Sequence, residues 1–372
     1  MMKTKLMTLF MLIPILATSL FQLPTITHAS ELNFAVEAVI PENQRDKTKT
    51  YFDLRMEPST EQTIEVNLRN DTDADVTVEP SVNTATTNLN GVVEYGVTKA
   101  KKDSTLPVNL TDIVTVQKEV TIPANDSVKV PLTIKMPATK FDGVLAGGIT
   151  IKEKDVATDK KESDSQGLAI NNKYAYVVAL ILNQTDKEVA PKLVLNDVKP
   201  AQVNARNVIN ANLQNTQAAY VNALDVVAKV TKKGSSEVLY ESSKKNMQMA
   251  PNSNFNYPIS LNGQKLEAGD YTLSLKADAK EGNWSFTKNF TIKAEDAKKY
   301  NQSDVSIKKD NTWIYLVIGL LLLVIVALII FFLIRNKKKK KEEEERRKKA
   351  ARLRKRKAQR KKQANQIKKN KE

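Results

Sequence analysis

The chain has 372 residues, of which 41% are hydrophobic and 27% are charged, and it contains no cysteine and one histidine, His28. Without cysteine there are no disulfide bonds and no thiolate sites, and one histidine leaves little room for a histidine-based metal or nucleophile site. The formal net charge of +16 lies entirely in residues 335–372, which hold 21 Lys and Arg against 5 Glu, so the rest of the chain has no basic surplus that would indicate nucleic-acid binding.

The N-terminus has the layout of a cleaved secretory leader. Two lysines precede an uncharged, largely apolar run over residues 6–23, and Ala29 supplies the small residue of a cleavage site. Pro14 interrupts the run, and about 15 apolar residues are short for a membrane span, so a retained helix is the weaker alternative. Cleavage removes residues 1–29 and with them the only histidine. We therefore expect no catalytic residue, metal ligand or cofactor in the mature chain, and no enzymatic activity.

The first predicted domain, residues 30–152, is dominated by alternating apolar residues. A period of two is typical of strands with one buried face. Two runs show it most clearly: Ile64, Val66 and Leu68, then Val128, Val130, Leu132, Ile134 and Met136. Pro80 and Pro131 interrupt such patterns and cannot donate a ladder hydrogen bond, which favours edge strands or bulges at these positions.

Residues 83–95 of this domain combine uncharged polar side chains with one tyrosine. Asn and Thr offer hydrogen-bond donors and acceptors without charge, and a tyrosine offers an apolar face, so the segment suits a neutral glycan. The candidate glycan- or partner-binding residues are Asn83, Thr86, Asn88 and Tyr95. The alternative is purely structural, because Asn90-Gly91 is a favoured type I′ turn pair for a β-hairpin. The two interpretations are compatible.

A charged stretch without apolar runs, residues 153–167, is predicted to be a linker or loop before the second domain, residues 168–295. Residues 174–182 are almost continuously apolar, which predicts a strand that is buried on both faces or that lies between the domains. Later strands alternate again, as in Phe255, Tyr257 and Ile259, then Tyr271, Leu273 and Leu275.

Two local features of the second domain admit alternatives. Tyr271 follows a Gly-Asp turn at the start of a strand, where the tyrosine corner of an immunoglobulin-like sandwich would lie, although a plain core tyrosine explains it equally well. In residues 206–215 we expect Val208, Ala211 and Leu213 to point inward. The Asn side chains of this segment would point outward or pair with turn backbone. This pattern favours a core strand over a binding segment.

Residues 313–334 contain no charged residue and would reach roughly 33 Å as a helix, which is enough to span a bilayer. Trp313 and Tyr315 suit the headgroup level at one end, and the Lys and Arg cluster at the other end marks the cytoplasmic side. The preceding residues 296–312 are predicted to be a juxtamembrane linker.

The basic tail, residues 335–372, is predicted to be cytoplasmic, which places residues 30–312 outside the cell, on the cell-wall side of a single-pass membrane protein. The tail has no aromatic residue for base stacking, so anionic membrane lipid is a nearer partner than nucleic acid. A topology signal that needs no specific ligand is the alternative.

The predicted fold class is all-β: two tandem immunoglobulin-like antiparallel β-sandwich domains, followed by a single transmembrane α-helix and a basic tail. Many short strands, few helical patterns and frequent Pro, Gly and Asn punctuation support it.

Several motifs occur in an order that resembles one known family. They are Phe34-Ala35-Val36, Ile40-Pro41-Glu42-Asn43-Gln44, Tyr51-Phe52-Asp53-Leu54, the run Asn-Thr-Ala-Thr-Thr-Asn-Leu-Asn-Gly at residues 83–91, the run Gln-Val-Asn-Ala-Arg-Asn-Val-Ile at residues 202–209, and Asn212-Leu213-Gln214-Asn215. With the leader, the single span and the basic tail, the chain resembles the WxL-interacting proteins over essentially its whole length.

The resemblance implies a Gram-positive cell surface and two immunoglobulin-like domains, one binding peptidoglycan and the next binding the host. It implies peptidoglycan, WxL-domain surface proteins and host extracellular matrix proteins as partners. The chain is not itself a WxL-domain protein, because neither Trp284 nor Trp313 lies in a Trp-x-Leu repeat.

Two function classes remain open. The first is a non-catalytic, membrane-anchored surface scaffold or adhesin that binds peptidoglycan through its first domain and WxL-domain or host matrix proteins through its second. The second is a membrane-tethered sensor of cell-wall or ligand state. A sensor needs a cytoplasmic docking module, and the tail has too few apolar side chains to form a core, which favours the scaffold.

Overall fold

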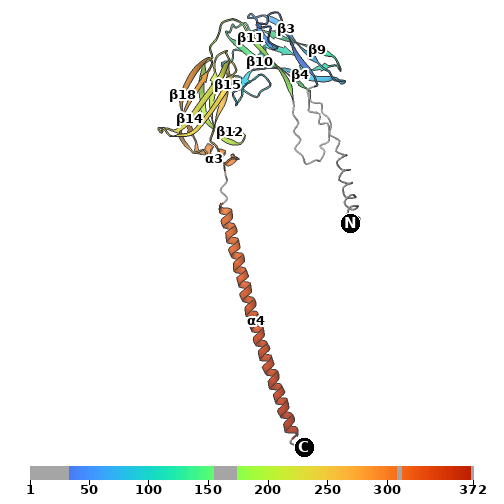
Figure 1. Cartoon of the computed structure of the whole chain (residues 1–372), viewed down its shortest axis with the longest axis vertical. Helices are drawn as coiled ribbons and strands as arrows, with labels where there is room; N and C mark the ends of the chain where they lie inside the picture. The colour runs from blue at the N-terminus through green and yellow to red at the C-terminus, as the bar shows by residue number, and fades with distance from the viewer. Residues whose placement is uncertain (1–32, 155–173, 308–311, 370–372) are drawn as a thin grey trace, which may run out of the picture. The chain divides into compact units, whose positions relative to one another are not determined.

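The computed structural model describes residues 33–154, 174–307 and 312–369 (Figure 1). The predicted leader lies outside these residues, as does the predicted linker 153–167 beyond residue 154. The chain divides into two compact units, one that ends at Ser306 and one that begins at Ile307.

The first part of the first unit is a sandwich of two sheets. The four-stranded sheet has the order β1-β3-β9-β7, with β1 at Ala35–Val39, β3 at Glu61–Arg69, β9 at Ser127–Lys135 and β7 at Val114–Val116. The five-stranded sheet has the order β2-β11-β10-β4-β8, with β2 at Phe52–Arg55, β11 at Ala175–Asn183, β10 at Val144–Glu153, β4 at Val76–Thr84 and β8 at Val120–Ile122. The short helix α2, Leu110–Ile113, precedes β7.

The core of this sandwich lies between the two sheets and follows the predicted alternation. Val66 and Leu68 of β3 are fully buried, as are Val130, Leu132 and Ile134 of β9. They pack in one apolar cluster with side chains of the facing sheet, such as Ile149 and Leu182. Burying alternate side chains of both sheets is the main stabilising term available to a chain without disulfide bonds.

Strand β11 completes the first sandwich, although the sequence analysis included it in residues 168–295. It pairs antiparallel with β10 and parallel with β2, in the register Leu180↔Phe52. Leu180 and Leu182 lie in the core of this sandwich, whereas Ile181 points to the other face and packs in a small cluster with Ala250. Burial on both faces, predicted for residues 174–182, therefore holds for residues 180–182, whereas Tyr174 and Val177 are exposed.

Both interrupting prolines lie where a strand loses one neighbour. The β4–β8 ladder covers Val76 to Val78, so Pro80 lies just past its end, and the β7–β9 ladder begins at Leu132, one residue after Pro131. At both positions the strand pairs with a neighbour on its other side only. The missing N–H of proline therefore leaves no ladder acceptor without a donor on the open side.

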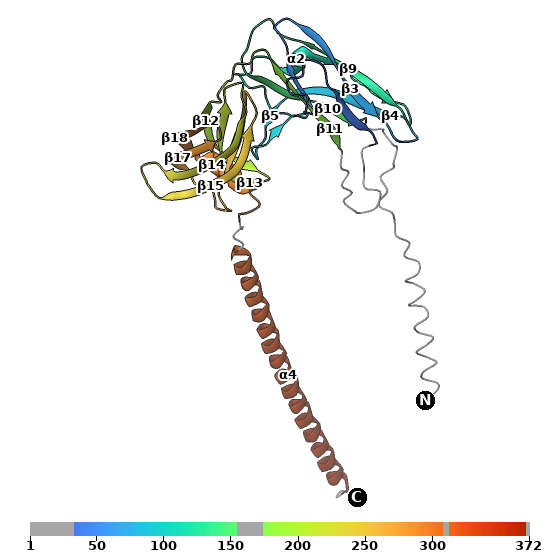
Figure 2. The ribbon, with the colours of Figure 1, turned by 45° about the horizontal axis from the view of Figure 1, so that its top comes forward.

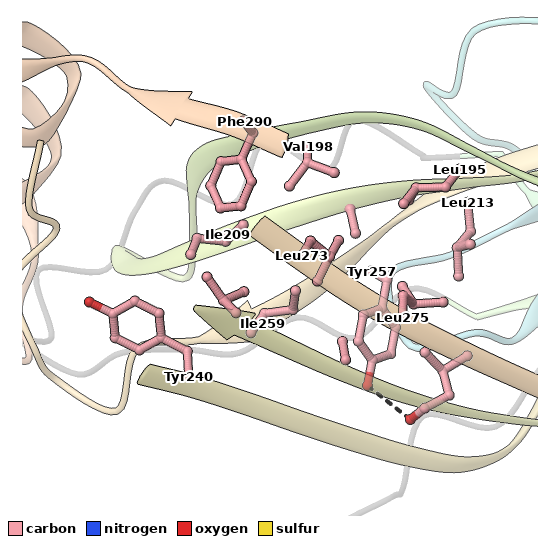
Figure 3. Packing of buried hydrophobic residues seen from close by; sticks show 14 of the residues in the cluster. Leu195, Val198, Ile209, Leu213, Tyr240, Tyr257, Ile259, Leu273, Leu275 and Phe290 are labelled. Carbon is pink, nitrogen blue, oxygen red and sulfur yellow. Dashed lines mark hydrogen bonds between the residues drawn. The ribbon is translucent and has the colours of Figure 1, made fainter. Parts of the chain in front are cut away.

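A second sandwich follows. Its three-stranded sheet has the order β12-β13-β16, with β12 at Leu193–Val203, β13 at Arg206–Asn215 and β16 at Ser253–Ser260. Its four-stranded sheet has the order β15-β14-β17-β18, with β15 at Val238–Met249, β14 at Val221–Lys232, β17 at Gly269–Ala279 and β18 at Gly282–Ile292. Figure 3 shows Tyr257, Leu273 and Leu275 interleaving in the core between these sheets.

Tyr271 forms the predicted tyrosine corner. Its side chain is 1% exposed and its hydroxyl donates to the backbone carbonyl of Glu267 at 2.9 Å. The ring also stacks on Phe290, with ring centroids 5.6 Å apart. The residue is therefore a core tyrosine that also closes the corner, because burial of the phenol requires a hydrogen-bond partner.

The second sandwich extends further along the chain than residue 295. Helix α3, Ala294–Ser303, takes up residues 296–303 of the predicted juxtamembrane linker, and it packs Ala297 against the core. Asn301 exchanges two hydrogen bonds with the backbone of Leu266, and Asp304 accepts one from the backbone N–H of Asn207 at 2.8 Å. The helix is polar in composition, so no apolar periodicity indicated it.

The second unit consists of helix α4, Thr312–Lys369. It is the one helix among the described residues that is long and apolar enough to cross a membrane, and none of its most apolar stretch is buried against protein. The span predicted at residues 313–334 lies within it, and the basic tail continues the same helix.

The position of β11 makes truncation a sharp test of this fold. A fragment of residues 31–160 lacks β11 and leaves β2 without its partner and β10 with an open edge. We expect it to aggregate or to unfold without cooperativity, whereas a fragment of residues 31–190 gives one cooperative urea transition by circular dichroism. Equal transition midpoints for the two fragments would contradict the assignment of β11 to the first sandwich.

Candidate functional site

The predicted hairpin is present, but its turn type differs from the prediction. Strands β5, Thr86–Thr87, and β6, Val93–Glu94, pair antiparallel. The turn is closed by the Gly91 N–H donating to the Asn88 carbonyl at 2.9 Å, and Gly91 alone in this turn has a positive φ, 71°. A type I′ turn needs positive φ at both central residues, so this is a type I turn followed by a left-handed glycine bulge.

Asn88, a candidate binding residue, serves this turn. Its Oδ1 accepts hydrogen bonds from the backbone N–H groups of Asn90 at 2.8 Å and Val92 at 3.1 Å. Its Nδ2 donates to the Glu94 carboxylate at 2.7 Å. Since Oδ1 and Nδ2 both have hydrogen-bond partners within the hairpin, the main role of Asn88 is to stabilise the turn.

The hairpin packs against the second sandwich. The Thr87 hydroxyl lies 2.7 Å from the Ser253 hydroxyl and accepts a hydrogen bond from the Ala250 N–H at 3.0 Å. The Gln248 N–H donates to the Gly91 carbonyl at 2.7 Å. A side chain at Gly91 would meet the Met247 sulfur at 2.5 Å, so glycine is required by contact as well as by φ. No local sequence pattern indicates this contact, because Thr87 and Ser253 lie 166 residues apart.

Asn83 and Thr86 face a second feature, a polar cavity of about 160 Å³ at this junction, together with Asp103 and Asn252. Asn83 donates weakly to the Thr150 hydroxyl at 3.4 Å. Asn252 donates to the carbonyls of Thr105 and Thr216, and thereby joins loops of both sandwiches.

Asp103 is the charged centre of the junction and is only 5% exposed. Its carboxylate accepts hydrogen bonds from Gln214 at 2.8 Å and from Asn254 of the second sandwich, and from the N–H and hydroxyl of Thr105 in its own loop. Burial alone would raise the pKa of Asp103, but the hydrogen bonds from Asn254, Thr105 and Gln214 outweigh it and hold the pKa below its ordinary value.

Tyr95 belongs to a different place. Its hydroxyl lies 3.1 Å from that of Tyr220, and burial raises the pKa of the Tyr220 phenol, which keeps it protonated. The backbone of Tyr95 crosses Gly148 of β10 so closely that a Cβ there would lie 2.6 Å from the Tyr95 carbonyl oxygen. Glycine at this position lets the segment after β6 lie flat on the sheet.

This segment forms one wall of a groove of about 1050 Å³, which we call the tyrosine groove. Its walls come from β1, from the loop before β2, from the segment after β6 and from β11. Its aromatic lining is Tyr51, Tyr95 and Tyr176, and its charged lining is Glu37, Glu94, Lys47 and Lys49. The formal charges cancel, so the groove offers aromatic faces without a net charge.

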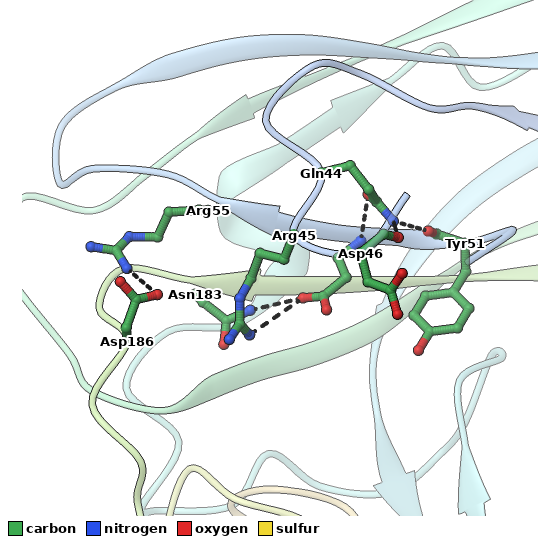
Figure 4. A network of polar contacts seen from close by, with 8 residues as sticks. Gln44, Arg45, Asp46, Tyr51, Arg55, Asn183 and Asp186 are labelled. Atoms are coloured by element: carbon green, nitrogen blue, oxygen red, sulfur yellow. Dashed lines mark hydrogen bonds and ion pairs between the residues drawn. The ribbon is translucent and has the colours of Figure 1, made fainter. Parts of the chain in front are cut away.

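The loop before β2 is fixed by Gln44 (Figure 4). The Gln44 Nε2 donates to the backbone carbonyl of Tyr51 at 2.8 Å, and its Oε1 accepts from the Asp53 N–H at 2.9 Å. Asp53 in turn accepts a hydrogen bond from Asn183 at 3.0 Å and lies 3.7 Å from Arg45. This network orients the loop that carries Tyr51, and it explains why polar residues interrupt this stretch of the sequence.

The four candidate residues therefore do not form one site. Tyr95 lines the tyrosine groove, whereas Asn83, Thr86 and Asn88 lie at the junction of the sandwiches. Sequence reasoning missed Tyr51 and Tyr176, because their proximity to Tyr95 depends on β11 and on the loop before β2.

Comparison with known proteins gives two adjoining matches. Residues 34–153 match the sequence profile of the peptidoglycan binding domain of WxL Interacting Protein, and residues 165–302 match the profile of the host binding domain. The second match includes β11, which pairs in the first sandwich. No curated protein matches the chain significantly.

Several solved structures show a distant likeness. The YadV chaperone is 11% identical, with 70% of this chain and 100% of that chain covered and a TM-score of 0.27. The Escherichia coli chaperone DraB is 13% identical (70% and 95% covered, TM-score 0.26), and the Salmonella enterica SafA pilin in complex with the SafB chaperone is 11% identical (71% and 99% covered, TM-score 0.28). Scores this low carry no argument about the present chain.

Replacing Asp103 with Asn should weaken the junction, because an amide donor would then face the donors of Gln214 and Asn254. We expect the Asp103→Asn substitution to lower the free energy of unfolding by about 1–3 kcal/mol at pH 7 in urea titrations. Because the folded pKa lies below the unfolded value of about 3.9, the contribution of Asp103 is complete above that value and is lost as the pH falls through the folded pKa. The difference between wild type and variant should therefore shrink below about pH 4. A difference that is independent of pH would contradict this role for the charge.

Proposed function

Because the chain belongs to the WxL-interacting protein family and carries its peptidoglycan binding and host binding domains in that order, we propose that it is a non-catalytic, membrane-anchored scaffold of a Gram-positive cell surface. The first sandwich would hold the cell-wall glycan, and the second would bind WxL-domain or host matrix proteins.

The tyrosine groove is the observation that carries the wall-binding part of the proposal. Pyranose rings expose C–H faces that pack on aromatic rings, and three tyrosines line this groove. Its balanced charges favour a neutral polymer over a charged one. The Gln44 network and the close packing of Tyr95 on Gly148 hold two of the three rings on fixed backbone, which lowers the entropy lost on binding.

Helix α4 supports the anchoring part of the proposal. Its large apolar side chains between Trp313 and Ile334 are exposed, and a lipid bilayer would cover them. The Lys and Arg residues that follow would stay on the cytoplasmic side and would attract anionic lipid headgroups.

Sedimentation with purified peptidoglycan sacculi tests wall binding. We expect Tyr51→Ala and Tyr176→Ala to weaken retention of the full chain about 2- to 10-fold, while Tyr51→Phe and Tyr176→Phe retain it, because the aromatic face is the contact. Retention should change little between low and high salt, since the contact carries no net charge.

Tyr174→Ala is the matched control, because Tyr174 is exposed near the groove but does not line it. Retention that is lost in moderate salt, or that the groove variants leave unchanged, would reject the tyrosine groove as the wall site.

Protease treatment of intact cells without their wall tests the anchor. We expect digestion of residues 30–312 and survival of a fragment that contains the span and the basic tail. An antibody against a tail epitope should bind only after the membrane is made permeable. Binding to untreated cells would reverse the proposed orientation.

A further inference from the structure

The three-stranded sheet of the second sandwich carries a row of amide side chains on the face away from its core. The neighbouring residues Leu213, Phe255 and Tyr257 point inward and are buried. The row consists of Asn196 on β12, Asn212 and Gln214 on β13, and Asn254 and Asn256 on β16. The sequence predicted Asn side chains on β13 that lie outward or against turn backbone. Asn212 lies outward and pairs with amides of both neighbouring strands, whereas Asn215 donates to the backbone carbonyls of Ala219 and Ala250.

Hydrogen bonds fix the direction of these amides. Asn196 donates to Asn212 at 3.0 Å and to Gln214 at 2.8 Å, and Asn212 donates to Asn254 at 3.2 Å and to Asn256 at 3.0 Å. Gln214 and Asn254 then donate to the buried carboxylate of Asp103. The row is thus held by a charge from the first sandwich, and its amides are oriented before any ligand arrives.

The row forms one wall of a groove of about 670 Å³, which we call the amide groove. The other wall comes from the first sandwich, namely from the β5–β6 turn, Thr98 and residues 100–104. Lys101 and Lys102 are balanced by Glu94 and Asp103, so the lining has no net formal charge. Neither sandwich forms this groove alone.

An unused acceptor lies beside the groove. The cavity of about 160 Å³ shares Thr86, Lys102 and Asn254 with the amide groove and also includes Asn252. Asn252 is 6% exposed, and its Oδ1 has no hydrogen-bond partner among the described residues. A buried acceptor without a partner is destabilising, and an O–H or N–H donor of a ligand would satisfy it.

We propose that the amide groove binds an uncharged oligosaccharide, at a site that requires both sandwiches and is separate from the tyrosine groove. Each sugar hydroxyl both donates and accepts, and oriented amides provide both partners without charge. Neighbouring strands lie about 4.8 Å apart, so amides on β12, β13 and β16 repeat at about the length of one sugar ring. Extended peptide presents equivalent groups about every 6.8 Å, which fits the row less well.

Isothermal titration of the full chain, in a detergent without a sugar headgroup, tests the proposal with three probes. Chitohexaose has a wall-type N-acetylated backbone, cellohexaose has the same linkage without N-acetyl groups, and an N-acetyllactosamine hexamer represents a host-type glycan. All titrations are repeated in the Tyr176→Ala background, which weakens binding in the tyrosine groove, so that a loss of binding there is distinguished from a loss of binding in the amide groove.

We expect at least one probe to bind in the Tyr176→Ala background, and the probe that binds identifies the source of the glycan. Asn256→Asp should weaken this binding at least about 5-fold, because it replaces a donor with a charge at unchanged size, while Asn283→Asp, on exposed β18 of the same sandwich, leaves it unchanged. Asn196→Ala is the second groove variant, and melting curves verify that each variant is folded. No binding by any probe, or equal binding by the Asn256 and Asn283 variants, would overturn the proposal.

Discussion

The packing of the β5–β6 hairpin against the second sandwich is the contact on which both grooves depend. Thr87 and Gly91 pin the hairpin to Ser253, Ala250 and Gln248 through short hydrogen bonds. Because the hairpin is fixed, the positions of its turn and of the segment after β6 are fixed as well. The segment after β6 becomes a wall of the tyrosine groove, and the turn becomes a wall of the amide groove. Figure 2 shows β5 in this bridging position.

The two grooves share a chemical character that follows from the composition of the chain. Cysteine and histidine are absent from the residues that the structure describes, and the surplus of positive charge is confined to the tail. What remains for recognition on these sandwiches is aromatic faces, amides and balanced pairs of charges. Such groups bind neutral, hydroxyl-rich polymers through many weak contacts, and such contacts need fixed side chains because each one contributes little.

Rigidity comes from buried or partly buried polar residues that each make several hydrogen bonds. Gln44 fixes the loop that carries Tyr51, Asp103 orients the amide row, and Asn301 ties helix α3 to the loop before β17. In each case a polar side chain is buried only where it makes several hydrogen bonds, as the cost of burying it requires. Gln44 and Asp103 thereby position side chains that line the two grooves, and Asp103 also lines the amide groove itself.

The sequence by itself determined the all-β class, the alternating core positions and the apolar helix that includes residues 313–334, and it named the tyrosine corner at Tyr271 as one of two alternatives. These features follow from local periodicity and turn chemistry, which neighbouring residues carry. Only the tertiary structure decided that β11 belongs to the first sandwich, that α3 belongs to the second, and that Tyr95 and Asn88 line different grooves. Those outcomes depend on contacts such as Thr87 with Ser253 and Asp103 with Gln214, whose partners lie more than 100 residues apart. No local pattern encodes which distant amide or hydroxyl a buried side chain will meet, because that choice is made by the packing of the two sandwiches.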